Sequence, residues 1–415
     1  MSAEKELHLM IVWHRGMSLK ARILADLQTR FQIANVYEIS WDEKDFPRNV
    51  SRFYGKKLPD IDRKVRECGL GSFLLVTFLD VSPVYGVRQT TSGLQRVNTN
   101  VFDLKKSYRD MDSVPFSIHA TNDPAETRRD IFLLLGEVYE NYLRDSVPWK
   151  GAVVQLKSNT YALDGFSGLK ELFQLLNQCA PYVVLRNYEN LPKTYVVGSH
   201  GDIDLLVGSL DDAVGLLCAK KESEVKYRVR YSVSVGGEDV YFDLRSAGDG
   251  YYDECFQKEI LASRIYNENG FYTPGAESHV YALLYHALIH KKDVSADYQA
   301  RLNAALVGVT GARDMTHGQL CSVLDDFMVG HGYRYTVPVD KSVHFNEDNI
   351  KTKDLILRPE LKRLMVSDFI GLTIKLNSLQ LYVLPGCLKK SIFRIYFSIG
   401  GLFKLDFSIG RVRRL

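Results

Sequence analysis

The run Gly-Asp-Ile-Asp-Leu-Leu-Val at residues 201–207 constrains this chain more than any other segment. Successive side chains of a strand point to opposite faces, so Asp202 and Asp204 share one face while Ile203 and Leu205 face a core. Two neighbouring carboxylates repel each other unless a cation lies between them. The run therefore predicts a buried strand whose polar side holds Mg²⁺ or Mn²⁺, since both ions favour oxygen ligands.

A third acid, Asp243, lies in the later strand-like run Val240–Arg245. If the two strands are neighbours, Asp243 completes a carboxylate triad with Asp202 and Asp204. Such triads hold one or two metal ions that stabilise the attacking and leaving oxygens of a phosphoryl transfer. An isolated Asp-x-Asp is common at solvated strand ends, so the third acid and the order of the surrounding elements carry this prediction.

Those elements follow in the order helix, strand, turn, Asp-x-Asp strand, helix, strand, Asp strand. This order resembles the nucleotidyltransferase fold, the DNA polymerase β-like superfamily. Residues 184–192 (VLRNYENLP) and 201–207 (GDIDLLV) are similar to the LRN…LP…GDIDLLV pattern of the subgroup found beside bacterial surface-polysaccharide genes. Tyr285-His286 and His290-Lys291, in a following helical segment, also look like that subgroup. The match covers residues 170–300, and the rest of the chain lies outside it.

The resemblance implies that Asp202, Asp204 and Asp243 are catalytic residues and ligands of Mg²⁺ or Mn²⁺. It implies transfer of a nucleotidyl or phosphoryl-linked group, or a sugar, from an activated donor to a sugar or glycan hydroxyl in surface-polysaccharide biosynthesis. One feature departs from the superfamily, which places Gly-Ser at a helix start well before the acids. Here Gly198-Ser199 comes directly before them. This spacing argues against a standard nucleoside triphosphate pocket and leaves a diphosphate-linked donor open.

Several residues near the acids are candidate substrate ligands. Arg186 and Asn187 follow the earlier strand, and an arginine in that turn binds phosphate well because its planar fork matches two oxygens. Ser199 is a further candidate. His286 and His290 share a helix face, but no third soft ligand accompanies them, so a zinc site is not favoured. A buried helix stripe explains them equally, and we expect His290 or Lys291 to contact substrate phosphate.

The first 150 residues predict a separate α/β domain of unknown role. Residues 8–13 and 73–79 are apolar strands, and residues 17–32 between them have helical spacing. Lys105, Arg109 and His119 precede a helix that begins at Asp123–Glu126, where they would form an anion pocket. Solvated basic surface and helix capping explain the same residues equally well. The helix is expected to continue to about residue 143, followed by a connector over residues 147–165.

The predicted architecture is an α/β N-terminal domain and an α+β nucleotidyltransferase-like domain with a helical extension and a basic, aromatic C-terminal tail. The expected boundaries are residues 1–150, 166–275, 276–345 and 346–415. The chain carries 53 basic and 50 acidic residues, a formal net charge of +3. This balance argues against a nucleic-acid partner. Six scattered cysteines and the lack of a long apolar run indicate a cytoplasmic protein.

Residues 386–415 interleave basic and aromatic side chains, which is typical of segments that lie on an anionic membrane surface. We therefore expect peripheral membrane attachment, unless the tail packs on the body of the protein. Two other functions stay open from the sequence. The first is modification of RNA or protein in a toxin–antitoxin type of system, and the second is an inactive nucleotidyltransferase-fold binding module.

Overall fold

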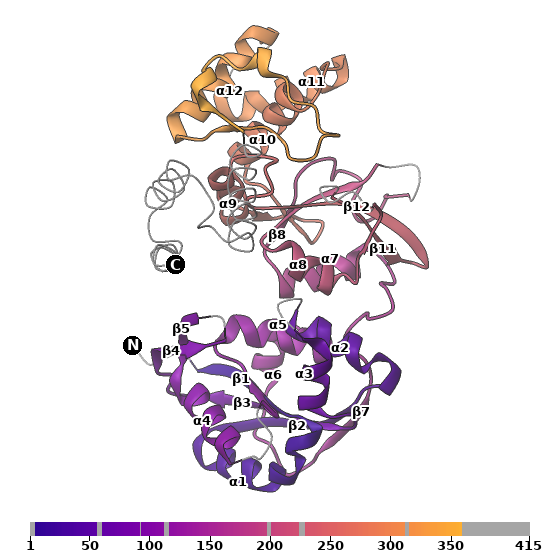
Figure 1. Ribbon diagram of the computed structural model, residues 1–415, viewed down its shortest axis with the longest axis vertical. Coiled ribbons are helices and arrows are strands. Elements are labelled where there is room, and N and C mark those ends of the chain that lie inside the picture. Colours follow the sequence, from indigo (N-terminus) through magenta and orange to yellow (C-terminus); the bar gives the residue numbers. More distant parts are fainter. Residues whose placement is uncertain are drawn as a thin grey trace, which may run out of the picture.

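The computed structural model describes residues 5–55, 60–91, 93–111, 116–196, 201–223, 229–311 and 315–358. It is a mixed α/β chain with two five-stranded sheets, each packed against helices (Figure 1). Ser199 and residues 386–415 lie outside the described residues, so their proposed roles stay predictions. Within the described part of the chain, no helix is both long enough and apolar enough to cross a bilayer.

The N-terminal unit spans residues 5–157. In chain order its elements are β1 (Glu6–Val12), the 3₁₀ helix η1 (His14–Leu19), α1 (Lys20–Arg30), β2 (Gln32–Ser40), η2 (Glu43–Asp45), α2 (Phe46–Tyr54), α3 (Ile61–Cys68), β3 (Phe73–Asp80), β4 (Tyr85–Thr90), β5 (Gly93–Asn98), α4 (Thr99–Asp110), β6 (Ile118–Ala120), α5 (Pro124–Leu135), α6 (Tyr139–Asp145) and β7 (Val154–Lys157).

The sheet of this unit has the strand order β6-β1-β3-β2-β7. Its strands are antiparallel to their neighbours except β7, which runs parallel to β2 and comes from the segment expected to be a connector. Both faces are buried, because odd residues of β1 such as Leu9 pack with α2, α3 and α5, while Met10 and Val12 pack with α1 and α4. The sheet thus lies between two helical layers (Figure 1).

Helix α5 begins as the sequence predicts and ends earlier. The Asp123 carboxylate accepts a hydrogen bond from the Glu126 N–H, and Pro124 occupies the first turn. The expected continuation to about residue 143 is wrong. Gly136 takes a left-handed conformation with φ of 71°, which closes the helix at Leu135, and α6 starts separately.

The C-terminal unit covers the described residues from 166 to 358. Its elements are α7 (Leu169–Cys179), β8 (Tyr182–Val184), β9 (Ile203–Val207), α8 (Leu210–Leu216), β10 (Lys220–Lys221), β11 (Arg230–Val235), β12 (Glu238–Ser246), α9 (Glu254–Ala262), β13 (Ile265–Tyr266), β14 (Tyr272–Thr273), α10 (Ala276–Ile289), α11 (Ala296–Thr310), α12 (His317–His331), β15 (Tyr335–Thr336), η3 (Glu347–Asn349), η4 (Lys353–Leu355) and β16 (Ile356–Leu357).

The second sheet has the order β10-β11-β12-β9-β8. Strand β9 is parallel to β12 and antiparallel to β8. Ile203 and Leu205 of β9 face a core that includes α7 and α8, as the alternation predicts. The opposite face carries Leu206 and packs toward α9 and α10. Asp204 belongs to this second face, so the acids lie on the side of the sheet that the C-terminal helices approach (Figure 1).

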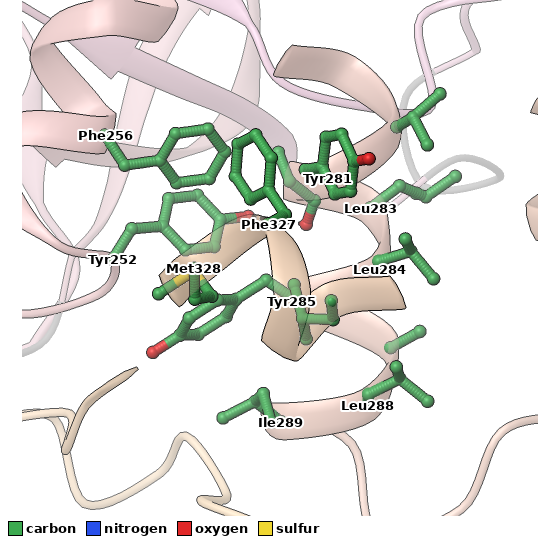
Figure 2. Close-up of a cluster of buried hydrophobic side chains, with 14 of the residues drawn as sticks. Tyr252, Phe256, Tyr281, Leu283, Leu284, Tyr285, Leu288, Ile289, Phe327 and Met328 are labelled. Atoms are coloured by element: carbon green, nitrogen blue, oxygen red, sulfur yellow. Dashed lines mark hydrogen bonds between the residues drawn. The ribbon is translucent and has the colours of Figure 1, made fainter. Parts of the chain in front are cut away.

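Helix α10 is the centre of the helical part. Every residue from Val280 to Ile289 is buried, because helices α9, α11 and α12 surround it. Figure 2 shows its Tyr281 and Tyr285 rings beside Tyr252, Phe256 and Phe327. The Tyr281 and Phe327 rings stack with centroids 3.6 Å apart. This packing fixes the orientation of α10 and therefore of the two histidines near its end.

Candidate functional sites

The three aspartates lie on one face of the second sheet, on adjacent strands. Asp204 of β9 and Asp243 of β12 are directly paired in the parallel register. Asp202 lies just before β9, two residues from Asp204, and therefore points to the same side. Strands β9 and β12 are therefore neighbours in the sheet, as the sequence prediction required.

Two effects set the electrostatics of Asp202 and Asp204, namely burial and the neighbouring charge of Asp243. Burial raises the pKa of both Asp202 and Asp204, and the charge of Asp243 raises each pKa further. Arginines oppose this effect. Arg230 Nη2 lies 3.3 Å from Asp202 Oδ1, and Arg186 Nη2 donates to Asp204 Oδ1 at 2.5 Å. A cation is the usual way to hold such charges together.

The donor set fits a hard divalent cation, because it consists of carboxylate oxygens. Asp202 and Asp204 turn toward their arginines, however, and the triad is not a tight cluster. Among the described residues, the group whose potential ligand atoms all lie within 4.8 Å is a different one, made by His119, Glu126 and Asp130. Metal binding at the aspartates would require the carboxylates to turn from arginine to the ion.

Arg186 lies beside the acids. Its side chain is 10% exposed, and its guanidinium reaches Asp204 rather than solvent. Its neighbour Asn187 adopts a left-handed φ of 56°, a conformation that asparagine tolerates, and its Oδ1 accepts a bond from Arg301 of α11. The turn after β8 therefore connects the acids to the helical part.

The two candidate residues at the end of α10, His290 and Lys291, differ in exposure. His290 caps the end of α10 and is 5% exposed, with its ring 4.2 Å from that of Tyr251. Lys291, the next residue, is exposed. Burial lowers the pKa of His286 and of His290 well below the usual range, and the charges of Arg186 and Arg245 act in the same direction. Both imidazoles are therefore neutral at neutral pH.

A second polar cluster surrounds His119 in the N-terminal unit. His119 is the middle residue of β6, where it is paired with Ile11 of β1, and its Nε2 lies 3.1 Å from Asp130 Oδ2 of α5. Burial lowers the pKa of His119 to about 3 and raises that of Asp130 to about 7. The edges of the Phe53 and Tyr54 rings enclose the imidazole. A neutral histidine is thus held in place by a buried carboxyl group.

Each of the two predicted cations of that cluster donates to a backbone oxygen of β6. Lys105 Nζ donates to Ala120 O and to Asn122 Oδ1, both at 2.9 Å, and burial lowers its pKa to about 8. Arg109 Nε donates to Ile118 O at 2.7 Å. Both side chains therefore brace β6 on either side of His119, and their charges lower the pKa of His119.

Several polar residues of these clusters were not among the residues predicted from the sequence. Asp130 carries a usable signal, since Thr127, Asp130, Ile131 and Leu134 form the buried face of α5. Tyr251 and Tyr298 carry none, because their approach to Arg186 depends on how distant parts of the chain pack together.

No family model and no curated protein matches this chain. Among solved structures, the nucleoside diphosphate kinase of Aquifex aeolicus is similar to part of it, at 16% sequence identity. The likeness covers 31% of this chain and 93% of that chain, with a TM-score of 0.23. A likeness of this size supports no conclusion about the fold or the activity of this chain.

Proposed function

We propose that the chain is a metal-dependent transferase whose active site is the face of the second sheet that carries Asp202, Asp204 and Asp243. One observation carries the proposal: Asp204 and Asp243 are register partners on parallel strands, with Asp202 on the same side. Burial and the charge of Asp243 both raise the pKa of Asp202 and of Asp204, and a divalent cation would relieve that repulsion.

Each residue has a distinct role in this proposal. Asp202 and Asp204 would hold Mg²⁺ or Mn²⁺, and Asp243 would serve as a third ligand or as the base that accepts the proton of the attacking hydroxyl. A bound ion supplies positive charge for the transferred phosphoryl group. Arg186, beside Asp204, would orient a phosphate of the donor, because its guanidinium binds two oxygens at once.

The resemblance to the surface-polysaccharide subgroup supports the choice of substrates. The donor would be a nucleotide-activated or phosphorylated sugar-type molecule, and the acceptor a hydroxyl of a sugar or glycan. If residues 386–415 bind an anionic membrane surface, the acceptor would be presented there.

A thermal-shift screen tests this function. Nucleotides and sugar nucleotides are added to the full chain with Mg²⁺ or with EDTA. A donor present at 100 times its Kd should stabilise the protein by about 2.7 kcal/mol, and only when the metal is present. Equal shifts in EDTA, or no shift with any donor, would contradict a metal-dependent donor site.

His119 supports a second candidate function, located in the N-terminal unit. Its imidazole is neutral, is oriented by Asp130 through Nε2, and lies beside the cationic Lys105 and Arg109. A neutral histidine held by a carboxyl group is a nucleophile that forms covalent intermediates. We propose that the Nδ1 lone pair of His119 attacks the γ-phosphorus of a nucleoside triphosphate, so that a P–N bond forms, the bridging P–O bond breaks and the nucleoside diphosphate leaves.

Incubation with γ-labelled ATP tests this second function. The full chain should acquire an acid-labile, alkali-stable label, as expected for a phosphorus–nitrogen bond. The label should be absent from His119→Gln and reduced about tenfold or more in Asp130→Asn, since Asp130 orients the ring. His14→Gln, which changes an exposed histidine, is the control. Label that persists in His119→Gln would exclude His119 as its site.

A further inference from the structure

A buried polar cluster lies behind Asp204, between the second sheet and helices α10 and α11. Tyr251 is its centre. The Arg186 and Arg245 guanidinium carbons lie 5.9 Å and 4.1 Å from the centroid of the Tyr251 ring. The Tyr251 hydroxyl is hydrogen-bonded to His286 Nδ1 at 2.7 Å. The His290 ring is in contact with the Tyr251 ring, and the His286 and Tyr298 rings are 6.1 Å apart.

Several polar atoms of this cluster are buried without a hydrogen-bond partner. They are Arg186 Nη1, the Tyr298 hydroxyl, both ring nitrogens of His290, and Asp249 Oδ2. Tyr251 lies close to two of these groups: burial lowers the pKa of His290 while a contact with the Tyr251 backbone opposes that change, and burial raises the pKa of Tyr251 while a contact with Arg186 opposes it. Buried donors left unpaired cost about 1–3 kcal/mol each, so a cluster of them requires an explanation.

The unpaired donors share a chemical character. Arg186 Nη1 carries positive charge, and the Tyr298 hydroxyl and one His290 nitrogen are neutral donors. Asp249 Oδ2 faces Arg245 Nη1 at 3.8 Å, so the charge of Asp249 balances the charge of Arg245. Asp249 is not a candidate metal ligand. A compact anion with several oxygen acceptors would satisfy the remaining donors together.

We propose that Arg186, His290 and Tyr298 form a phosphate subsite, which Asp204 masks until its carboxylate turns to a metal ion. The proposal deepens the proposed transferase function and rests on it for the identity of the ligand, the phosphate group of the donor. Tyr251 and His286 position the subsite through their mutual hydrogen bond.

The masking follows from the charges. Arg186 now pairs with Asp204, and Arg245 with Asp249, so the cluster has no cation to spare. When Asp204 binds a metal ion, the charge of Arg186 becomes available and its two terminal nitrogens can bind phosphate oxygens as a fork. Metal and phosphate should therefore bind with positive coupling, and each should strengthen the other by the same factor.

Calorimetric titration of the full chain with inorganic phosphate tests the subsite, with ionic strength held constant by chloride. Wild type should bind phosphate about tenfold more tightly with Mg²⁺ than with EDTA. Asp204→Asn keeps the side-chain shape and removes the competing charge. In EDTA, this variant should bind phosphate about tenfold more tightly than wild type does, and Mg²⁺ should add nothing.

Tyr298→Phe separates a binding role from a structural one. Its hydroxyl has no partner, so its removal should leave the melting temperature unchanged. Phosphate binding in Mg²⁺ should nevertheless weaken about tenfold, and His290→Gln should weaken it similarly. Tyr266→Phe, which removes a hydroxyl from a tyrosine that is 58% exposed, is the matched control.

Two results would overturn the subsite. One is wild-type phosphate affinity in both Tyr298→Phe and His290→Gln, and the other is no gain in affinity in a folded Asp204→Asn. If Asp204→Asn does not fold, two measurements still test the subsite: the effect of Mg²⁺ on the phosphate affinity of wild type, and the phosphate affinity of Tyr298→Phe. Coupled phosphate binding without turnover of any donor would support the subsite and reject the transferase. Donor turnover that is unchanged in Tyr298→Phe and His290→Gln would support the transferase and reject the subsite.

Discussion

Replacing Asp204 by asparagine is expected to reduce metal-dependent transfer by at least about a hundredfold, because a bound metal contributes several kcal/mol to such reactions. Asp204 is buried in the middle of the acidic face, with Asp243 as its register partner. A neutral amide is a poor ligand for a hard divalent cation. Donor-to-acceptor transfer measured over a range of Mg²⁺ concentrations checks the loss.

Two comparisons make this result specific. Asp202→Asn should lose activity with less effect on the melting temperature, since the side chain of its partner Arg230 is 48% exposed. Asp204→Asn should melt a few degrees lower, because Arg186 keeps an oxygen acceptor but loses its buried countercharge. Asp239→Asn, an exposed acid on the same strand as Asp243, should behave as wild type. Full activity in Asp204→Asn would place the chemistry elsewhere.

Arg52→Ala is expected to destabilise the protein by about 3 kcal/mol, since hydrogen bonds from a buried charge contribute more than neutral ones. Arg52 of α2 is 3% exposed and joins the two units. Its Nε and Nη2 both donate to Leu216 O at the end of α8, at 3.0 Å and 2.5 Å. Its Nη1 donates to Tyr161 O. Alanine would leave these carbonyls buried and unpaired.

The measurement is thermal unfolding of the full chain. The expected drop in melting temperature is roughly 2–4 °C for each kcal/mol lost, so about 6–12 °C. Arg48→Ala is the matched control on the same helix, because Arg48 is 51% exposed and its partner Asp164 is 75% exposed. Arg48→Ala should change stability by less than about 0.5 kcal/mol. Equal effects of the two variants would show that Arg52 does not join the units.

The elements around the acids follow directly from sequence pattern. The alternation of Asp202 and Asp204 with apolar residues defines β9, and Gly236-Gly237, both with positive φ, forms the turn between β11 and β12. The pattern works here because each strand buries one apolar face, which fixes its register.

The contacts between these elements could not be predicted from the sequence pattern. The Arg186–Asp204 ion pair and the His119–Asp130 pair join residues whose meeting depends on how helices and strands pack. The sequence places Arg186 and His119 near strand ends but gives no partner for either. It places β7 in a connector because that short strand has little apolar content, and pairing with β2 outweighs its weak local propensity.

The proposed function requires that Asp202, Asp204 and Asp243 hold a divalent cation. Crystals of the full chain soaked in Mn²⁺ would test it most directly, through the position of the anomalous scattering peak. We predict a peak between the carboxylates of these aspartates, with the Asp204 carboxylate turned away from Arg186. A peak at His119, Glu126 and Asp130, with none at the aspartates, would contradict the claim and move the metal to the N-terminal unit.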